Sequence, residues 1–333
     1  MEEQQPTTQQ ETVFQSRIDL SKLQAAVYAI REEINKIIVG QDEMSDLLIA
    51  AILSDGHVLI EGVPGVAKTL SAKLIAKTIS SGFSRIQFTP DLMPSDVIGT
   101  SVFNTKTSDF EFRKGPLFSN IILIDEINRS PAKTQAALFE AMEERQITVD
   151  GQTHFLEQPF TVIATQNPVD HEGTYRLPEA QLDRFLFKIE VTYPSLEHET
   201  KIISDFHGRN NKIDLSVIKQ VISASELADY RKKAAQVFVE PHLMKYIAQI
   251  VSQTRSNTAL FLGASPRASL AILTASKSIA AMRGRDFITP EDIRFVTKPV
   301  LRHRILLTPE KEMEGVTAAE VINQLIEKVE VPR

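Results

Sequence analysis

The 333-residue sequence contains no cysteine, which excludes disulfide bonds, thiol catalysis and zinc sites built on cysteine. No apolar run approaches the roughly 20 residues that a membrane-spanning helix needs, so we expect no membrane insertion. The N-terminus lacks the apolar core of a signal peptide, and we therefore expect a cytoplasmic protein. The sequence also lacks an excess of positive charge. Its net charge of −6 gives no general attraction to nucleic acid, although this value does not exclude local basic patches.

The remaining composition is that of an ordinary globular protein, with 42% hydrophobic and 24% charged residues. The chain is long enough for two domains. Residues 1–16 are rich in Gln, Glu and Thr with little to bury, which predicts a disordered tail. We place the domain boundary at Tyr193-Pro194-Ser195, with one domain over 17–194 and a second over 195–333.

The segment Gly62-Val-Pro-Gly-Val-Ala-Lys-Thr69 fits the phosphate-binding pattern G-x-x-x-x-G-K-[ST], with Ala67 in place of the second glycine. The apolar run Val58-Leu-Ile60 before it predicts a buried strand, and residues 70–77 after it have helical apolar spacing. A strand, a loop and a helix in this order are what such a loop requires. The alternative, a glycine-containing turn without a ligand, is less favoured by this context.

The chemistry expected of this loop follows from its residue types. Successive backbone N–H groups and the positive end of the following helix would surround an anionic phosphate. Lys68 would reach the β- and γ-phosphates, and the hydroxyl of Thr69 would bind Mg²⁺. Ala67 must then adopt a backbone conformation that is open to an L-residue.

A second strand, Ile121-Ile-Leu-Ile-Asp-Glu126, is aliphatic until its last two residues. Ligands of parallel sheets bind at the carboxyl ends of the strands. Nucleotide hydrolysis needs a carboxylate near Mg²⁺ and a second group for the attacking water, and we assign these roles to Asp125 and Glu126. The alternative is an acidic strand end that caps the next helix.

Three further polar residues are candidates for the same reaction. Asn167 ends the strand expected between the other two, where its amide could orient water, although an Asn-Pro turn explains it equally well. Arg184 precedes the last strand and Arg267 begins a later helix. Either arginine could stabilise charge on a transferred phosphoryl group or be an ordinary ion-paired side chain.

Around these motifs the pattern predicts an α/β domain with five parallel strands, followed by a helical domain. An insertion over 90–115 contains a hairpin, and an Asp150-Gly151 turn predicts another over about 146–160. We expect at least two of Phe103, Phe110 and Phe112 to pack against the core. A first helix is expected from a cap at Asp19 to Ile38. In the second domain only helices are expected, at 197–208, 225–236, 240–254, 266–283 and 290–299.

The order of these motifs resembles the MoxR family of AAA+ ATPases over about residues 20–330. The resemblance is carried by the P-loop and by four further segments, 123–129, 164–168, 177–185 and 263–267. It implies a P-loop AAA+ core, with a five-stranded parallel sheet, and a C-terminal all-α lid. It also identifies the 90–115 insertion as the helix-2 insert and the second hairpin as the pre-sensor-1 hairpin, both facing a central pore. Arg176 departs from the family pattern, which often has proline there.

By the same resemblance, Lys68 and Thr69 are Walker A, Asp125 and Glu126 Walker B, and Asn167 sensor 1. Arg184 matches the arginine finger that reaches a neighbouring subunit, and Arg267 matches sensor 2. ATP and Mg²⁺ are the implied cofactors, with Thr69 and Asp125 at the metal. The implied nucleotide-binding residues are Val39, Gly40, Gly62, Val63, Pro64, Gly65, Val66, Ala67, Lys68, Thr69 and Leu70.

The family implies a ring, usually a hexamer, that remodels or activates partner proteins in a chaperone-like way, often with a partner carrying a von Willebrand factor A domain. Three alternatives remain open from the sequence. A nucleic-acid motor could line its pore with Lys106, Arg113 and Lys114. The acidic balance and the lack of a recognisable nucleic-acid module argue against it. The other two are the ATPase subunit of a metal chelatase and a low-turnover nucleotide switch. Glu126 argues against the switch, since an intact base should allow hydrolysis.

Overall fold

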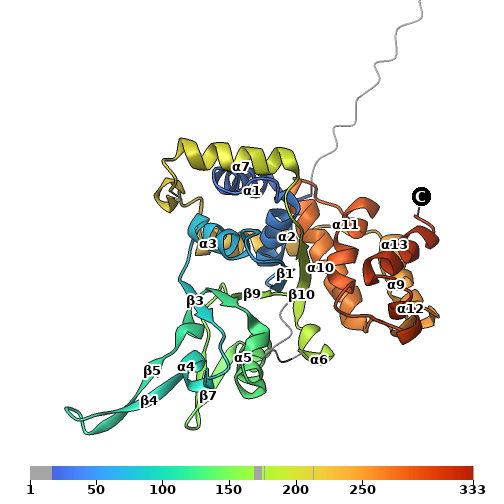
Figure 1. The fold of residues 1–333 in the computed structure, drawn as a ribbon. Helices are drawn as coiled ribbons and strands as arrows, with labels where there is room; N and C mark the ends of the chain where they lie inside the picture. The colour runs from blue at the N-terminus through green and yellow to red at the C-terminus, as the bar shows by residue number, and fades with distance from the viewer. Residues whose placement is uncertain (1–16, 169–174, 176, 213, 333) are drawn as a thin grey trace, which may run out of the picture.

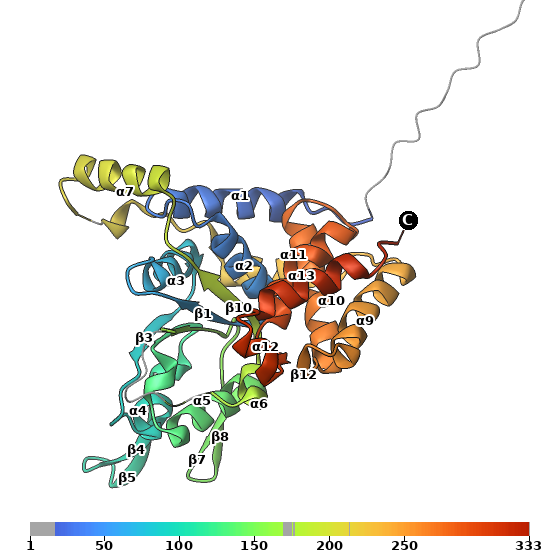
Figure 2. The same cartoon turned by 45° about the vertical axis from the view of Figure 1, so that its right-hand side comes forward.

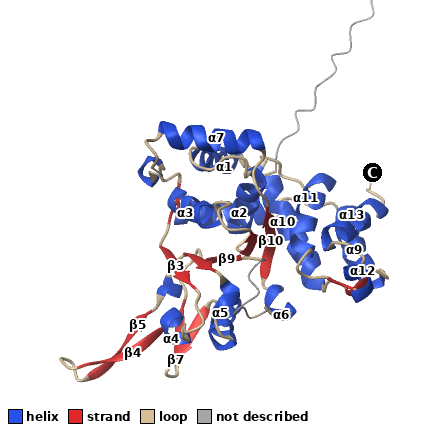
Figure 3. Ribbon diagram, in the orientation of Figure 1, coloured by secondary structure: helices blue, strands red, loops and turns tan. Residues whose placement is uncertain are grey.

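The structure, a computed structural model, describes residues 17–168, 175, 177–212 and 214–332. The predicted tail over 1–16 and Arg176 therefore lie outside the described residues. A five-stranded parallel sheet forms the centre, in the order β10-β1-β9-β6-β3 (Figures 1 and 3). These strands are β1 (His57–Gly62), β3 (Phe83–Gln87), β6 (Ile121–Asp125), β9 (Thr161–Gln166) and β10 (Phe185–Val191). The predicted parallel sheet is confirmed, with β9 between β1 and β6.

The two faces of the sheet are both buried, because successive side chains of a strand point to opposite sides. Ile121 and Leu123 of β6 belong to one apolar cluster, whereas Ile122 and Ile124 belong to another. The first cluster includes α1 (Ser21–Asn35), α2 (Asp42–Leu53) and α3 (Lys68–Thr78). The second includes α5 (Ala132–Glu144), with α4 (Pro94–Ile98) and the short 3₁₀ helix η1 (Pro116–Phe118). Burial on both faces explains the uninterrupted aliphatic sequence of these strands.

The first helix is shorter than its apolar spacing predicts, because it ends at Asn35 rather than Ile38. The residues after Asn35 form a turn that leads into α2, and Ile38 is still buried there. The helix cap was also predicted one residue too early. Leu20 is the N-cap, while the Asp19 carboxylate accepts hydrogen bonds from the backbone and hydroxyl of Ser21.

Two hairpins project from the same end of the domain (Figures 1 and 2). One is β4 (Gly99–Asn104) with β5 (Asp109–Lys114), and the other is β7 (Gln146–Val149) with β8 (Gln152–Phe155). The predicted packing of the hairpin phenylalanines was wrong for two of the three. Phe103 and Phe110 contact each other but remain 50% and 68% exposed, because the hairpin extends beyond the core. Phe112 alone is half-buried, and it stacks on His154 of the second hairpin.

The rest of the chain is mainly helical, and the expectation of a purely helical domain needs two corrections. Short strands occur there: β11 (Ile222–Ser223) pairs with β2 (Ile79–Ser80), and β12 (Leu260–Leu262) pairs with β13 (Leu306–Leu307). Two helices near the C-terminus were also missed. The helices are α7 (Leu196–Gly208), α8 (Ala224–Ala235), α9 (Pro241–Ser256), α10 (Pro266–Met282), α11 (Pro290–Leu301), α12 (Pro309–Met313) and α13 (Ala318–Lys328), with the 3₁₀ helix η3 (Leu215–Val217).

One apolar cluster runs from the face of the sheet into this helical region, since α10 packs against both α1 and α2. Helix α7 is different, because none of its residues is buried. It lies beside α1 at the edge of the domain (Figures 1 and 2). The division of the chain at Pro194 stays a prediction. Among the described residues, no helix combines the length and apolar character needed to cross a membrane.

Candidate functional site

The loop between β1 and α3 has the backbone path that phosphate binding needs. Gly65 has a φ of +87°, and a side chain there would meet no atom within 4 Å, so the loop is open at this point. Ala67 is the N-cap of α3 and has a φ of +64°. This left-handed conformation is open to an L-residue but costs about 1–2 kcal/mol. The loop therefore keeps the glycine-like geometry although alanine occupies the position.

Lys68 begins α3 and its side chain turns back across the loop. Its Nζ donates hydrogen bonds to the carbonyls of Gly62 and, at 3.3 Å, Gln166. The lysine thus spans the ends of β1 and β9, the two neighbouring strands whose carboxyl ends meet there. An ammonium group in this position is well placed to meet an anion held by the loop.

Thr69 and Asp125 come together at the end of β6. Thr69 Oγ1 donates to Asp125 Oδ1 at 3.0 Å, and Thr165 Oγ1 donates to the same oxygen at 3.2 Å. The other oxygen, Oδ2, is 2.6 Å from Nε of Arg85. A carboxylate and a hydroxyl side by side are hard oxygen donors of the kind that Mg²⁺ prefers, so this donor set fits the expected metal.

Glu126 follows Asp125 in a left-handed conformation, with a φ of +59°. Its backbone N–H donates to Thr165 Oγ1 at 3.1 Å, which fixes the turn. Its Oε2 accepts a hydrogen bond from Gln87 Nε2 at 3.0 Å and lies 3.1 Å from Arg129 Nε. The strained backbone turns the two neighbouring carboxylates to separate partners, an arrangement that often marks functional sites.

A cavity of about 370 Å³ unites these groups. The side chains of Lys68, Thr69, Asp125, Glu126 and Asn167 all line it. The sequence analysis assigned these five residues to one site, and the structure brings them together at this cavity. The lining also contains residues that the sequence analysis missed, namely Arg85, Gln87, Thr165 and Gln166. All four lie in β3 or β9, strands that end at the cavity, and strand ends are where such residues could have been sought.

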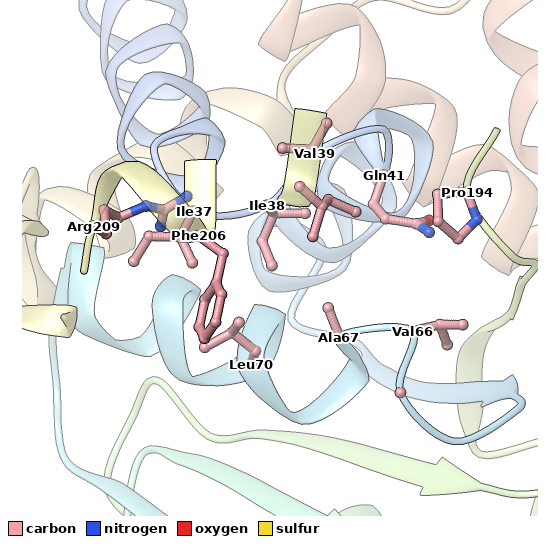
Figure 4. Close-up of a pocket in the computed structure, with 12 residues that line it drawn as sticks. Ile37, Ile38, Val39, Gln41, Val66, Ala67, Leu70, Pro194, Phe206 and Arg209 are labelled. Carbon is pink, nitrogen blue, oxygen red and sulfur yellow. The ribbon is translucent and has the colours of Figure 1, made fainter. Parts of the chain in front are cut away.

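A second cavity, of about 240 Å³, adjoins the first because Gly65, Ala67 and Leu70 line both. Its walls are mostly apolar, as an aromatic base requires. Figure 4 shows the ring of Phe206 directed towards Leu70, with Ile38 above the loop that carries Ala67. The lining comprises Ile37, Ile38, Val39, Gln41, Gly65, Val66, Ala67, Leu70, Pro194, Ile202, Phe206 and Arg209.

The segment predicted to contact a base is only part of this second cavity. Val39 lines it, whereas Gly40 shapes the turn that holds Val39 and Gln41. Gly40 has a φ of +72°, and a Cβ there would lie 2.3 Å from Nδ1 of His198. The three residues from α7 and its C-cap, Ile202, Phe206 and Arg209, were missed. Their apolar periodicity was visible, but nothing in it indicated that α7 covers the P-loop.

Arg184 and Arg267 lie apart from both cavities and close to each other. Arg184 donates to the carbonyl of Phe139 at 2.7 Å. Glu143, near the end of α5, contacts both arginines: its Oε2 is 3.3 Å from Arg184 and its Oε1 is 3.4 Å from Arg267. Neither arginine is among the residues that line the phosphate or the apolar cavity.

Comparison with known proteins agrees with this geometry. The family described as "ATPase family associated with various cellular activities (AAA)" matches residues 57–187, and the AAA lid domain matches residues 252–325. The chain is 45% identical over 301 residues to the uncharacterized protein YeaC of Bacillus subtilis, covering 90% of this chain and 93% of the relative. It is 44% identical over 310 residues to the chaperone MoxR1 of Mycobacterium tuberculosis, covering 90% of this chain and 81% of the relative.

A solved structure shows the same fold. The crystal structure of a Cytophaga hutchinsonii protein, provisionally described as an ATPase, superimposes with a TM-score of 0.86 at 41% identity. The match covers 94% of this chain and 97% of the other. Similarity at this level extends across the P-loop, the sheet and the helical region together. The chain belongs to the MoxR family of AAA+ ATPases.

Proposed function

We propose that this protein binds ATP and Mg²⁺ and hydrolyses the terminal phosphoanhydride bond. The observation that carries the proposal is the convergence of Lys68, Thr69, Asp125 and Glu126 on one cavity beside an apolar pocket. The apolar pocket would hold the adenine, and the loop N–H groups and Lys68 would hold the phosphates. Thr69 and Asp125 would hold Mg²⁺, which neutralises phosphate charge when bound.

Glu126 is proposed to act on the attacking water. Its carboxylate is held by Gln87 and lies next to Asp125, so it can accept a proton or orient water near the terminal phosphate. Asn167 lines the same cavity and would orient that water or contact the terminal phosphate. Both roles are assigned from position and chemistry.

We infer further that Arg184 and Arg267 act on the nucleotide of a neighbouring subunit. They lie away from their own phosphate cavity, and arginines of this kind stabilise the charge that develops during phosphoryl transfer. A site completed by a neighbour requires a head-to-tail interface, which closes into a ring. We propose a hexamer.

The proposed biological role is chaperone-like remodelling or activation of partner proteins in the cytoplasm. The relative from Mycobacterium tuberculosis is named a chaperone, and the similarity covers most of its length. The exposed Phe103 and Phe110 provide apolar contact area for a partner protein. A partner with a von Willebrand factor A domain is proposed from the family resemblance. The nucleic-acid motor, the chelatase subunit and the low-turnover switch are not favoured.

The proposal is tested by the ATPase rate at increasing protein concentration, for wild type, Glu126→Gln and Arg184→Ala. We expect the rate per subunit to rise as the ring assembles and both variants to be inactive. Mixing the two variants should restore part of the activity, because an intact Glu126 from one subunit then meets an intact Arg184 from another. A rate per subunit that is independent of concentration, with normal turnover by Arg184→Ala, would refute the shared site.

A further inference from the structure

We propose that Glu143 is a positioning residue that holds Arg184 and Arg267 together so that both reach the nucleotide of the neighbouring subunit. The inference rests on the proposed function, because it requires that the two arginines act across an interface. It adds a residue that the P-loop, strand-end and arginine motifs do not contain. The carboxylate contacts neither the phosphate cavity nor the apolar pocket of its own subunit.

The contacts of Glu143 are divided evenly between the two arginines. Oε2 lies 3.3 Å from a terminal nitrogen of Arg184, and Oε1 lies 3.4 Å from a terminal nitrogen of Arg267. The two arginines come from segments that are far apart in sequence, at the start of β10 and in the first turn of α10. One carboxylate from α5 therefore joins the core of the protein to its helical region at this point.

The backbone that carries both arginines is fixed separately. The buried guanidinium of Arg304 donates to Asp183 Oδ1 at 2.6 Å and to the carbonyls of Asp183 and Phe185 at 3.0 and 2.6 Å. These bonds fasten the residues on either side of Arg184. Ser265, two residues before Arg267, donates to Asp183 Oδ2 at 3.5 Å. The backbone around Arg184 is thus held by several hydrogen bonds, and its guanidinium also donates to the carbonyl of Phe139 at 2.7 Å. The side chain of Arg267 is held by Glu143.

The electrostatics explain why a carboxylate is needed at this position. Two guanidinium groups on the same carboxylate repel each other, and the negative charge of Glu143 offsets this repulsion. The Glu143 side chain is 38% exposed and that of Arg267 is 60% exposed, so the pair remains open to a ligand. Each guanidinium has five N–H donors, and bonding to Glu143 leaves others for a phosphate of the neighbouring subunit.

The test is Glu143→Gln in the full-length protein at concentrations that support ring assembly. Glutamine keeps the size of the side chain but has one acceptor oxygen and no charge, so it cannot hold both arginines. We expect kcat to fall about 10- to 100-fold, since small misplacements of a charged group have such effects. The KM for ATP should stay within about twofold, because ATP binds to the P-loop of the other subunit.

Glu144→Gln is the matched control. Glu144 is the next residue on α5 and is also exposed, and it makes no ion pair within the described part of the chain. Its substitution removes the same charge from the same helix without touching the arginines. We expect kcat and KM of this variant to match those of the wild type.

Mixing experiments distinguish positioning from general damage. Glu143→Gln mixed with Glu126→Gln should regain activity at about a quarter of the interfaces, because Glu143→Gln supplies an intact P-loop and Glu126→Gln supplies intact arginines. Glu143→Gln mixed with Arg184→Ala should regain nothing, because both are defective on the arginine side.

Recovery in the first mixture and none in the second would establish the role of Glu143. If Arg184→Ala and Glu126→Gln complement each other but Glu143→Gln retains wild-type kcat, the role of Glu143 is refuted while the shared site stands. The role is equally refuted if Glu143→Gln is complemented by Arg184→Ala, or raises KM as much as it lowers kcat. If Arg184→Ala and Glu126→Gln fail to complement, the proposed function itself fails.

Discussion

His57, at the start of β1, should make the folded protein lose stability as the pH falls below about 6.5. The side chain is 4% exposed, and its neutral form is fully hydrogen-bonded. Its Nδ1 accepts the backbone N–H of Val162 at 3.0 Å, and its Nε2 lies 3.3 Å from the carbonyl of Met142, to which it would donate. Protonation of Nδ1 would replace this hydrogen-bond acceptor with a second donor that faces the N–H of Val162.

Burial, together with the nearby positive charge of Arg145, lowers the pKa of His57 from 6.5 to about 3. Between these two pH values the unfolded chain binds a proton at this residue and the folded chain does not. The stabilisation that neutral His57 provides is therefore complete above pH 6.5 and is lost as the pH falls towards 3, by about 1.4 kcal/mol per pH unit. At pH 5.0 the loss is about 2 kcal/mol, and the full difference is about 5 kcal/mol.

The assay is urea unfolding at pH 7.5, 6.0 and 5.0, for wild type, His57→Gln and, as a control, His242→Gln on the exposed side of α9. The free energy of unfolding of His57→Gln should depend less on pH, by about 2 kcal/mol between pH 7.5 and 5.0. His242→Gln should keep the wild-type dependence. The reasoning is refuted if the imidazole nitrogens of His57 titrate between pH 6 and 7 by NMR, or if His57→Gln and wild type change equally with pH.

Two further predictions concern the nucleotide site. Ala67→Gly should raise the free energy of unfolding by about 0.5–1 kcal/mol, because glycine adopts the φ of +64° without strain. Chemical denaturation measures this, and an unchanged or lower stability would contradict it. Phe206→Ala should weaken ATP binding about tenfold through loss of an aromatic contact with the base, and should leave inorganic tripolyphosphate binding unchanged. Calorimetry on this variant and on Ile203→Ala, a control at a 65% exposed position of α7, would decide it, and equal losses for both ligands would rule out base contact.

The phosphate site could be predicted because its residues are contiguous or end strands. Residues 62–69 carry the loop in one segment, and Asp125 and Glu126 follow an aliphatic strand. Parallel strands place their carboxyl ends at one edge, so the meeting of Thr69 with Asp125 follows once the sheet is assigned. Arg85 and Gln87 lie in β3 towards the same edge. They were missed because polar residues that alternate with apolar ones along a strand are usually expected to face solvent.

The helices near the C-terminus had a readable signal that was overlooked. Thr317 and Glu320 form a capping box, and the buried Val321, Ile322, Leu325 and Ile326 of α13 recur at helical spacing. The exposed Phe103 and Phe110 are a different case, because alternation in a hairpin does not reveal whether a core lies beneath it.

By itself, the sequence determined the P-loop, the five strands of the central sheet, and the chemistry of the carboxylates, because each depends on residues close together in the chain. Only the tertiary structure decided which distant segments meet. It placed Phe206 of α7 over the P-loop, and it brought Glu143 of α5 between Arg184 and Arg267. These contacts join residues separated by tens to more than a hundred positions, and local periodicity contains no information about the packing that brings them together.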